Sequence, residues 1–544
     1  MSYKKFIAEN PFPAETESAT KGGPYLWGSS GWCGACSIED FLPGMRDLRL
    51  THEDARGFLK YVTQFAAANF WYGDREVAAW MYEEPHDNWM DRYGMDAVRI
   101  FYHSGHGDMS PDGVFSAPMG SVWDKRDTIR SDRKMSFADE KLRYLFWSTC
   151  LSLRTTGGHT PIRTWSKANK GLRMLFGYDT VSYDDANYGA YFGEECRKGR
   201  SFKDAFLSAS WRIDHRQSPS VCAMGANKAE ALARLAKEKA FYQSRVSSHY
   251  WAWEWLTPSN KSSRESMALL KEPHNKNTLI LAPEMIDDTM LSIIGNKAGL
   301  TQRTAASINI DAYGTRIIGT KALRVSLNRA GHVSLELGKA NYQNEKQIGE
   351  SKAHKIAKDF ISELGLAKGI KLEQATTYHV VQGGGNTKTE ELCEPKVVET
   401  LIQFRQEHDS LKSVNSEHGL IAVSVDNDGK ITKVFSSLKP IVDEREQVSA
   451  PTASAQESTR SRDELFQQKI NKIIGSKIYS AMNPDGGTKF PSAKEISELN
   501  PTVKIIDEKI GYDFSSNIVK PVHQRDVEIA VGPYAKRYKL RVDL

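Results

Sequence analysis

The spacing of hydrophobic residues predicts alternating strands and helices in the first 255 residues. Three short apolar runs, 97–103, 142–150 and 171–179, are each bounded by Gly, Ser or charged residues. Continuous apolar runs of this length are typical of strands buried on both faces, as in a parallel sheet covered by helices. Helical spacing of apolar residues is found over 50–70 and 201–213. This alternation predicts an α/β fold with a mostly parallel sheet.

Thr51 and Asp54 stand at the start of the first of these helices with the spacing of a capping box. In such a box both side chains hydrogen-bond to the first turn of the helix. The pattern therefore predicts that Asp54 has a local, helix-capping role.

Residues 256–448 have a different pattern and predict an α+β accessory region. An amphipathic helix over 350–365 ends at Gly365, and two strand-like runs over 419–441 are joined by the turn "DNDG". Between them, "VQGGGNTKTEE" (381–391) has the composition of a flexible loop.

The remainder of the chain divides into a linker and a small C-terminal segment. Residues 449–462 are polar and rich in Ser and Thr, which is typical of a linker. The segment 463–544 opens with a predicted helix and ends in two alternating runs, 526–532 and 537–544, that predict strands. We therefore expect four parts: 1–255, 256–448, 449–462 and 463–544.

Composition narrows the class of protein. With 544 residues the chain is too long for one core, and roughly two to four domains are expected. Its net charge of +5 is scattered along the chain, so no nucleic-acid-binding face is expected. No window reaches 18 apolar residues, so membrane insertion is not expected. The N-terminus does not resemble a secretory signal, although secretion of a longer precursor stays open. Six cysteines fit a reducing compartment, and cytoplasmic is the default expectation.

Cys33 and Cys36 form a C-x-x-C motif, "GWCGACS". A thioredoxin-type site needs this motif between a strand and a long helix, whose N-terminus lowers the pKa of one thiol. Here a Gly-rich, loop-like stretch precedes the motif, and no second pair at zinc spacing is visible. A redox role for the two cysteines stays open as a minor alternative.

The run 98–110, "VRIFYHSGHGDMS", ends in two histidines. His103 and His106, with Asp108, could bind a metal, but three ligands within six residues of one turn have poor geometry. The run could also be an ordinary turn at the end of a strand. A third reading makes His106 a general base.

Cys150 supports the third reading because it ends the next apolar run, "LRYLFWSTC". Neighbouring parallel strands end at the same edge of a sheet, and sites of doubly wound sheets lie at that edge. The sequence therefore predicts that His106 and Cys150 meet there, where the imidazole would activate the thiol. His159, nine residues past Cys150, is a rival base.

The two halves "RIFYHSGHG" and "YLFWSTC" resemble the caspase-like cysteine peptidases, which include caspases, gingipains and legumains. The resemblance covers about residues 90–215 and is nearest to an uncharacterised bacterial family with the motif "SGHG". The caspase pentapeptide is absent, since "STCLS" stands in its place.

This resemblance implies a caspase-like three-layer sandwich with Cys150 as nucleophile and His106 as general base and acid. It also implies an oxyanion hole formed by the backbone N–H groups of Gly107 and Cys150. The group that orients His106 stays open between Ser104 and a carbonyl of the turn.

The same resemblance implies that loops after the third strand line the substrate pocket. Asp179, Asp184 and Asp185 fall in these loops, and a carboxylate there would favour Arg or Lys in the substrate.

A second resemblance, to PepSY and thermolysin-propeptide modules, covers about residues 398–440. The matching residues are Gln403, Gln406, Val423, Val425, Asp426, Gly429 and Ile431. Such modules often restrain a peptidase, so the C-terminal region could inhibit the N-terminal one within the same chain.

Together these features predict a cysteine endopeptidase that cleaves protein or peptide substrates through an acyl-enzyme, with no cofactor and no metal. The alternative is a non-catalytic binding or scaffold protein built on the same fold. We also expect the linker 449–462 to be cut during self-processing, since it contains Arg460 and Arg462.

Overall fold

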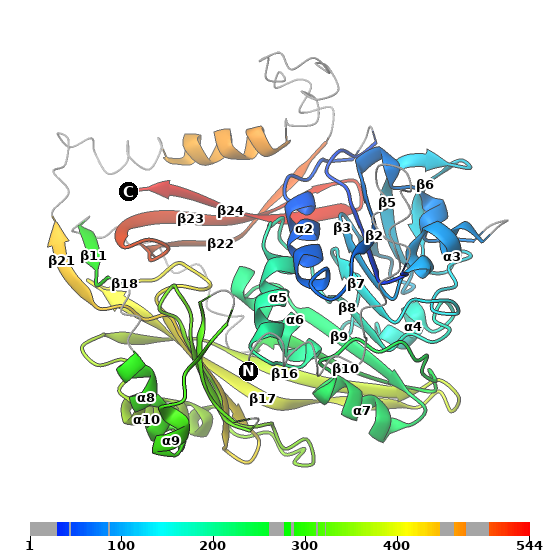
Figure 1. Ribbon diagram of the computed structural model, residues 1–544. Helices are drawn as coiled ribbons and strands as arrows, with labels where there is room; N and C mark the ends of the chain where they lie inside the picture. The colour runs from blue at the N-terminus through cyan, green and yellow to red at the C-terminus, as the bar shows by residue number, and fades with distance from the viewer. Residues whose placement is uncertain are drawn as a thin grey trace.

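One long mixed sheet runs from the N-terminal part of the chain into the accessory region (Figure 1). The computed structural model describes residues 30–42, 45–84, 88–259, 277–283, 288–311, 314–320, 322–445, 462–474 and 500–544. Within these ranges the fold is mixed α/β, as the hydrophobic pattern predicts.

The first part of the sheet is parallel. Its strands, in spatial order, are β2 (Ala68–Gly73), β1 (Cys33–Ser37), β3 (Ile100–Ser104), β7 (Tyr144–Ser148) and β8 (Met174–Tyr178). The last three are the predicted apolar runs, and all of their residues are buried. The prediction of parallel strands buried on both faces is therefore confirmed for these runs.

The C-x-x-C motif lies in β1, a buried strand between β2 and β3 that the hydrophobic pattern does not predict. Successive side chains of a strand point to opposite faces, so residues three apart are on opposite sides. Cys33 accordingly packs in the core on one face and Cys36 in the core on the other. The two thiols cannot form a disulfide in this arrangement, and burial raises the pKa of Cys36 to about 12.

Helices and a small sheet cover the two faces. One face is covered by α2 (Thr51–Val62), α5 (Tyr188–Arg197) and α6 (Phe202–Ile213). The other is covered by α3 (Trp89–Tyr93), α4 (Pro161–Trp165) and the sheet of β4 (Asp108–Met109), β5 (Phe115–Trp123) and β6 (Arg126–Arg130). No helix in the part of the chain that the structure describes combines the length and apolarity needed to cross a membrane.

Beyond β8 the sheet is antiparallel, so the expectation of a mostly parallel sheet holds only for its first part. The antiparallel strands begin with β9 (Pro219–Gly225), β10 (Tyr250–Pro258), β16 (Leu372–Asn386) and β17 (Leu392–His408). They continue with β19 (Leu420–Asp426), β20 (Ile431–Ser436), β15 (Val333–Glu336), β14 (Arg324–Leu327), β13 (Arg316–Gly319) and β12 (Asn309–Ile310). Because β10 pairs with both β9 and β16, hydrogen bonding is continuous between the N-terminal part and the accessory region.

The predicted helix and hairpin of the accessory region are confirmed as α10 (Glu350–Leu364) and β19–β20. Gly365 ends the helix with a φ of 72°. The predicted loop at 381–391 is wrong in its first half, because Gly383, Gly384 and Gly385 lie inside β16. They face the strand that carries Trp253, which packs where a side chain at Gly383 would be.

A second sheet is formed mainly by the C-terminal segment. It consists of β21 (Ile441–Arg445), β11 (Thr278–Leu281), β23 (Ile518–Val531), β22 (Thr502–Asp513) and β24 (Tyr534–Asp543). The predicted helix (residues 462–474) packs against it through Phe466, Ile470 and Ile474. In Figure 1 the red hairpin of β23 and β24 reaches from this sheet to the N-terminal part. Arg462 begins the helix, whereas Arg460 and residues 449–461 lie outside the described residues.

Candidate active site

The register of β3 and β7 brings the predicted histidine and cysteine to one edge of the sheet. Ser104 pairs with Ser148, and His106 and Cys150 each follow two residues later. Gly107 lies directly against the second strand end, since a Cβ atom added to it would be 2.7 Å from the carbonyl oxygen of Cys150. The close approach of the two turns therefore requires glycine at this position.

A backbone carbonyl orients the imidazole of His106. Its Nε2 lies 2.8 Å from the carbonyl oxygen of Arg46, in the loop between β1 and α2. A carbonyl oxygen can only accept, so Nε2 carries a proton and the basic nitrogen of the neutral ring is Nδ1. The ring also packs against Phe41, with 4.9 Å between centroids. Neither loop residue has a sequence pattern that would have indicated this role.

Ser104, the alternative partner for His106, is instead bound to Asp54. Each oxygen of the buried Asp54 carboxyl accepts two hydrogen bonds: one from Tyr102 Oη (2.7 Å) and Gly189 N (2.8 Å), the other from the hydroxyls of Ser104 and Ser148 (both 2.7 Å). Burial raises the pKa of Asp54 to about 6, although these hydrogen bonds lower it. Asp54 thus ties α2 and α5 to the ends of β3 and β7.

The thiol of Cys150 is fully buried, and its polar contacts are with Ser182 and Ala535. Ser182 N donates to Sγ at 3.3 Å, the Ser182 hydroxyl lies at 3.4 Å, and Sγ–H donates to the carbonyl oxygen of Ala535 at 3.1 Å. The next residue, Leu151, has a φ of 57°, a left-handed conformation that is unfavourable for a leucine. Strained backbone of this kind is concentrated at functional sites.

The contact with Ala535 is part of a wider contact of β24 with this edge. Arg537 N donates to Ser182 O, and Asp184 N donates to Arg537 O, both at 3.1 Å, which makes a parallel bridge. The Lys536 ammonium donates to the Ser182 hydroxyl at 3.0 Å. The candidate nucleophile is therefore covered by a segment 385 residues away in the sequence, and no local pattern predicts this contact.

The three predicted pocket carboxylates have different surroundings. Asp179 accepts from the amide and hydroxyl groups of Thr155 and Thr156, so it closes the loop after β7. Asp185 accepts from Asn187 before α5. Asp184 accepts from Arg49 N at 3.1 Å. Burial raises the pKa of Asp184, while the charges of Lys536 and Arg46 lower it.

The other histidines near the site have separate partners. His103 is buried beside Tyr82, with 2.6 Å between Nδ1 and the phenol oxygen, and burial lowers its pKa to about 3. His159 Nε2 accepts from Arg154 at 3.2 Å. Among the described residues, the groups close enough to share a metal ion are Asp91, Asp96 and Asp139, and His408, Asp409 and Glu444. Neither group includes His103, His106 or Asp108.

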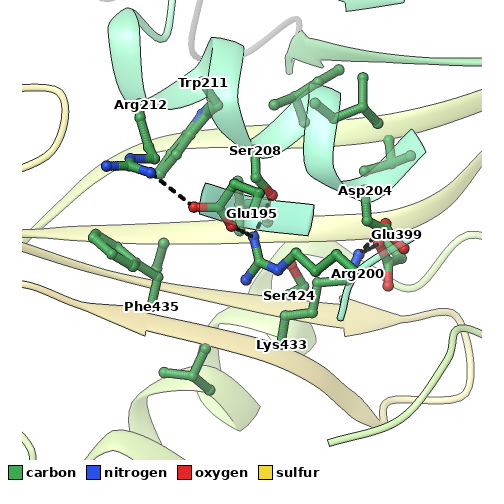
Figure 2. Close-up of a pocket in the computed structure, with 16 residues that line it drawn as sticks. Glu195, Arg200, Asp204, Ser208, Trp211, Arg212, Glu399, Ser424, Lys433 and Phe435 are labelled. Carbon is green, nitrogen blue, oxygen red and sulfur yellow. Dashed lines mark hydrogen bonds and ion pairs between the residues drawn. The ribbon is translucent and has the colours of Figure 1, made fainter. Parts of the chain in front are cut away.

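A separate cavity of about 90 Å³ lies between α6 and the antiparallel strands (Figure 2). Leu207 and Trp211 of α6 face apolar side chains of the sheet across it. Its charged groups pair with one another: Glu195 with Arg212 (3.0 Å) on one side, and Lys433 with Asp204 on the other. We interpret this cavity as part of the interface between the two regions and not as the active site.

Comparison with known proteins gives a match for the part of the chain that contains this site. Residues 32–270 match the model of a family described as "Domain of unknown function (DUF6345)". The matched segment includes His106 and Cys150. No curated protein matches the chain.

Proposed function

We propose that this protein is a caspase-like cysteine peptidase whose nucleophile is Cys150 and whose general base is His106. The observation that carries the proposal is the placement of these two residues on adjacent parallel strand ends in register. This edge of a parallel sheet is where α/β enzymes have their active sites. The oriented tautomer of His106 gives the second support, because a base needs a fixed ring with its lone pair on a defined nitrogen.

In the proposed reaction the thiol proton moves to His106 Nδ1 and the thiolate attacks the carbonyl carbon of a peptide bond. The negative charge on the oxygen is stabilised by the N–H groups of Gly107 and Cys150. The C–N bond then breaks, the amine leaves with the proton from His106, and a thioester on Cys150 remains. Water hydrolyses this thioester, with His106 taking and returning the proton. No metal or cofactor takes part in this scheme.

Among the three carboxylates considered for substrate recognition, Asp184 has the best support. It is adjacent to Ser182 and Tyr183, the segment that forms the wall beside Cys150. Asp179 and Asp185 are engaged by their own loops. The proposed preference for Arg or Lys therefore rests on Asp184.

The alternative is a scaffold in which Cys150 is a buried structural thiol. Its complete burial under β24 favours this reading. The two readings differ in one measurable property, because an activated thiolate reacts with iodoacetamide well below pH 8 and a structural thiol does not.

The test measures both alkylation and peptide cleavage in a chain whose contact with β24 is weakened. Lys536→Glu replaces the ammonium that binds the Ser182 hydroxyl with a carboxylate and adds a like charge near Asp184, so it should displace the strand. In this background we expect Cys150 to be alkylated at pH 6.5 before the more exposed Cys393, and a peptide library to be cleaved. Adding His106→Ala should abolish the preferential labelling. Adding Cys150→Ala should reduce cleavage by at least about 1000-fold.

Lys504→Glu is the matched control, because Lys504 is exposed on β22 and carries the same charge change. If iodoacetamide reaches Cys150 in the Lys536→Glu chain but this chain cleaves no peptide, the peptidase proposal is wrong. The protein is then better described as a scaffold.

A further inference from the structure

The strand that follows the turn of the C-terminal hairpin is extended and lies over Cys150, as a bound peptide would. β23 and β24 are joined by Gly532 and Pro533, a two-residue turn in which Gly532 has a φ of 59°. The strand that leaves this turn passes over Cys150 before it continues along the second sheet. The turn therefore presents an extended segment, Tyr534–Arg537, to the candidate active site; the hairpin that carries it is drawn in red in Figure 1.

We infer that Tyr534–Arg537 occupies the place of a peptide substrate, and that Ser182 and Asp184 form a pocket for a lysine or arginine side chain. This inference rests on the proposed peptidase function, because it names what that same site binds and what holds it closed.

The backbone contacts are those of strand addition. Arg537 exchanges two hydrogen bonds of 3.1 Å with the segment of Ser182 and Asp184. Extended peptides commonly bind by adding a strand to an exposed edge, where main-chain hydrogen bonds supply affinity and side-chain pockets supply specificity. The carbonyl oxygen of Ser182 and the N–H group of Asp184 could therefore bind the backbone of an external peptide in the same way.

The side-chain contact defines the pocket. Lys536 is only 3% exposed, and its ammonium donates to Ser182 Oγ at 3.0 Å. A lysine is almost never buried to this extent unless it is paired. The Asp184 carboxylate is close enough for the charge of Lys536 to lower its pKa against the effect of burial, and its Oδ1 is a buried acceptor without a hydrogen-bond partner among the described residues. An arginine or lysine of a substrate would find the Ser182 hydroxyl and, with its longer reach or additional donors, the unpartnered Asp184 Oδ1.

The geometry at the thiol explains why the segment would be held and not cut. Cys150 Sγ faces the carbonyl oxygen of Ala535 as a hydrogen-bond donor. An attacking thiolate must face the carbonyl carbon, while the oxygen points to the N–H donors that stabilise its charge. Tyr534–Arg537 thus blocks the site as an inhibitor. The residues with the PepSY-like pattern lie in β17, β19, β20 and the turn between the last two. In this inference the inhibitory segment is therefore part of β24 and not of the PepSY-like stretch.

The test compares full-length wild type, Lys536→Glu and Lys504→Glu with fluorogenic peptides that differ at the residues flanking the cleaved bond. We expect Lys536→Glu to cleave at least tenfold faster than the other two chains, and peptides with Lys or Arg beside the cleaved bond to be preferred at least tenfold. Adding Asp184→Asn, which keeps an acceptor for Arg49 N, should remove that preference. Removal of one charged hydrogen-bond partner typically costs about tenfold or more.

A synthetic peptide of residues 530–540 provides a second measurement that does not depend on a destabilised hairpin. Added to the Lys536→Glu chain it should inhibit cleavage, whereas the same peptide with Glu in place of Lys536 should not. If all three chains cleave the same peptides at equal rates, the peptidase proposal stands and the inhibitory role of β24 is wrong. If cleavage rises but shows no basic preference, the pocket assignment is wrong.

Discussion

At the scale of single residues, Asp54 has a role that differs from the one its local sequence pattern predicts. Its spacing from Thr51 predicts a capping box, but α2 has no side-chain cap, and Asp54 instead binds two strands and α5. The donors come from residues 48 to 135 positions away along the chain. Sequence spacing reports only neighbours along a helix, so it could not have predicted them.

Substitution of Asp54 tests this role. Asp54→Ala leaves four buried donors without an acceptor and should lower the free energy of unfolding by about 3 kcal/mol or more. Asp54→Asn should cost less than about 1 kcal/mol, because its amide can donate to the hydroxyls of Ser104 and Ser148 while its oxygen accepts from Tyr102 and Gly189. Chemical denaturation of both variants measures the difference, and equal losses would contradict it.

The raised pKa of Asp54 predicts that the difference in stability between wild type and Asp54→Asn depends on pH. Its pKa moves from 3.8 to about 6 on folding, so between these values the folded state binds more protons than the unfolded state. The contribution of Asp54 to stability is then fully present below about pH 4 and is lost as pH rises through 6, a change of about 3 kcal/mol. We expect wild type to lose this stability relative to Asp54→Asn between pH 4 and 6.5. A constant difference would contradict the shift.

At the scale of elements, sequence predicts those strands whose apolar residues are continuous. β3, β7 and β8 are of this kind, and their parallel arrangement predicts that His106 and Cys150 follow neighbouring strand ends at one edge of the sheet, as the register shows. β1 was missed because "CGACS" is short and built of small residues. Its Gly34 leaves room for the ring of Phe70 from β2, which a side chain at that position would overlap. A small residue in a strand can therefore mark close packing from a neighbour, a signal visible only once the neighbour is known.

The glycines of β16 follow the same rule: their composition predicts a loop, but they lie in a strand against a large neighbouring side chain. Gly383 is directly opposite Trp253 of β10, and an added Cβ would lie 2.5 Å from the indole nitrogen. We expect Gly383→Ala to lower the free energy of unfolding by about 1–3 kcal/mol, because the buried indole must shift. Gly338→Ala is the control, since no atom lies within 4 Å of its added Cβ. If both variants have the same thermal midpoint, this packing does not constrain β16.

At the scale of the whole molecule, the site is completed by parts of the chain that sequence reasoning treats as separate. The proposed catalytic pair comes from residues 106 and 150, the orienting carbonyl from Arg46 and the covering strand from residues 534–537. The apolar runs predict the strands that His106 and Cys150 follow. The positions of the loop and of the C-terminal hairpin depend on contacts between distant segments, which no local pattern predicts. Several ion pairs join the hairpin to the N-terminal part: Arg216 pairs with Asp507 and Asp526, and Lys539 with Asp214 at 3.1 Å.

This polar contact predicts that β24 can be released without unfolding the domain below it. Arg216→Ala removes the cation between Asp507 and the almost fully buried Asp526. Loss of one partner of a buried ion pair typically costs about 3–5 kcal/mol. Here the loss should weaken the binding of the hairpin to the N-terminal part. Arg525→Ala is the control, because Arg525 pairs with Glu508 and Asp463 within the C-terminal segment.

Hydrogen exchange distinguishes release of the hairpin from general unfolding. The amides of Arg537 and Asp184 hydrogen-bond across the contact at 3.1 Å, so they exchange only when β24 leaves. In Arg216→Ala we expect their exchange to accelerate at least tenfold, with no change for the amides of β3 and β7. Equal acceleration in β3 and β7 would mean that the domain itself opens. No acceleration at Arg537 would mean that the backbone bridge, and not the ion pairs, holds β24 over Cys150.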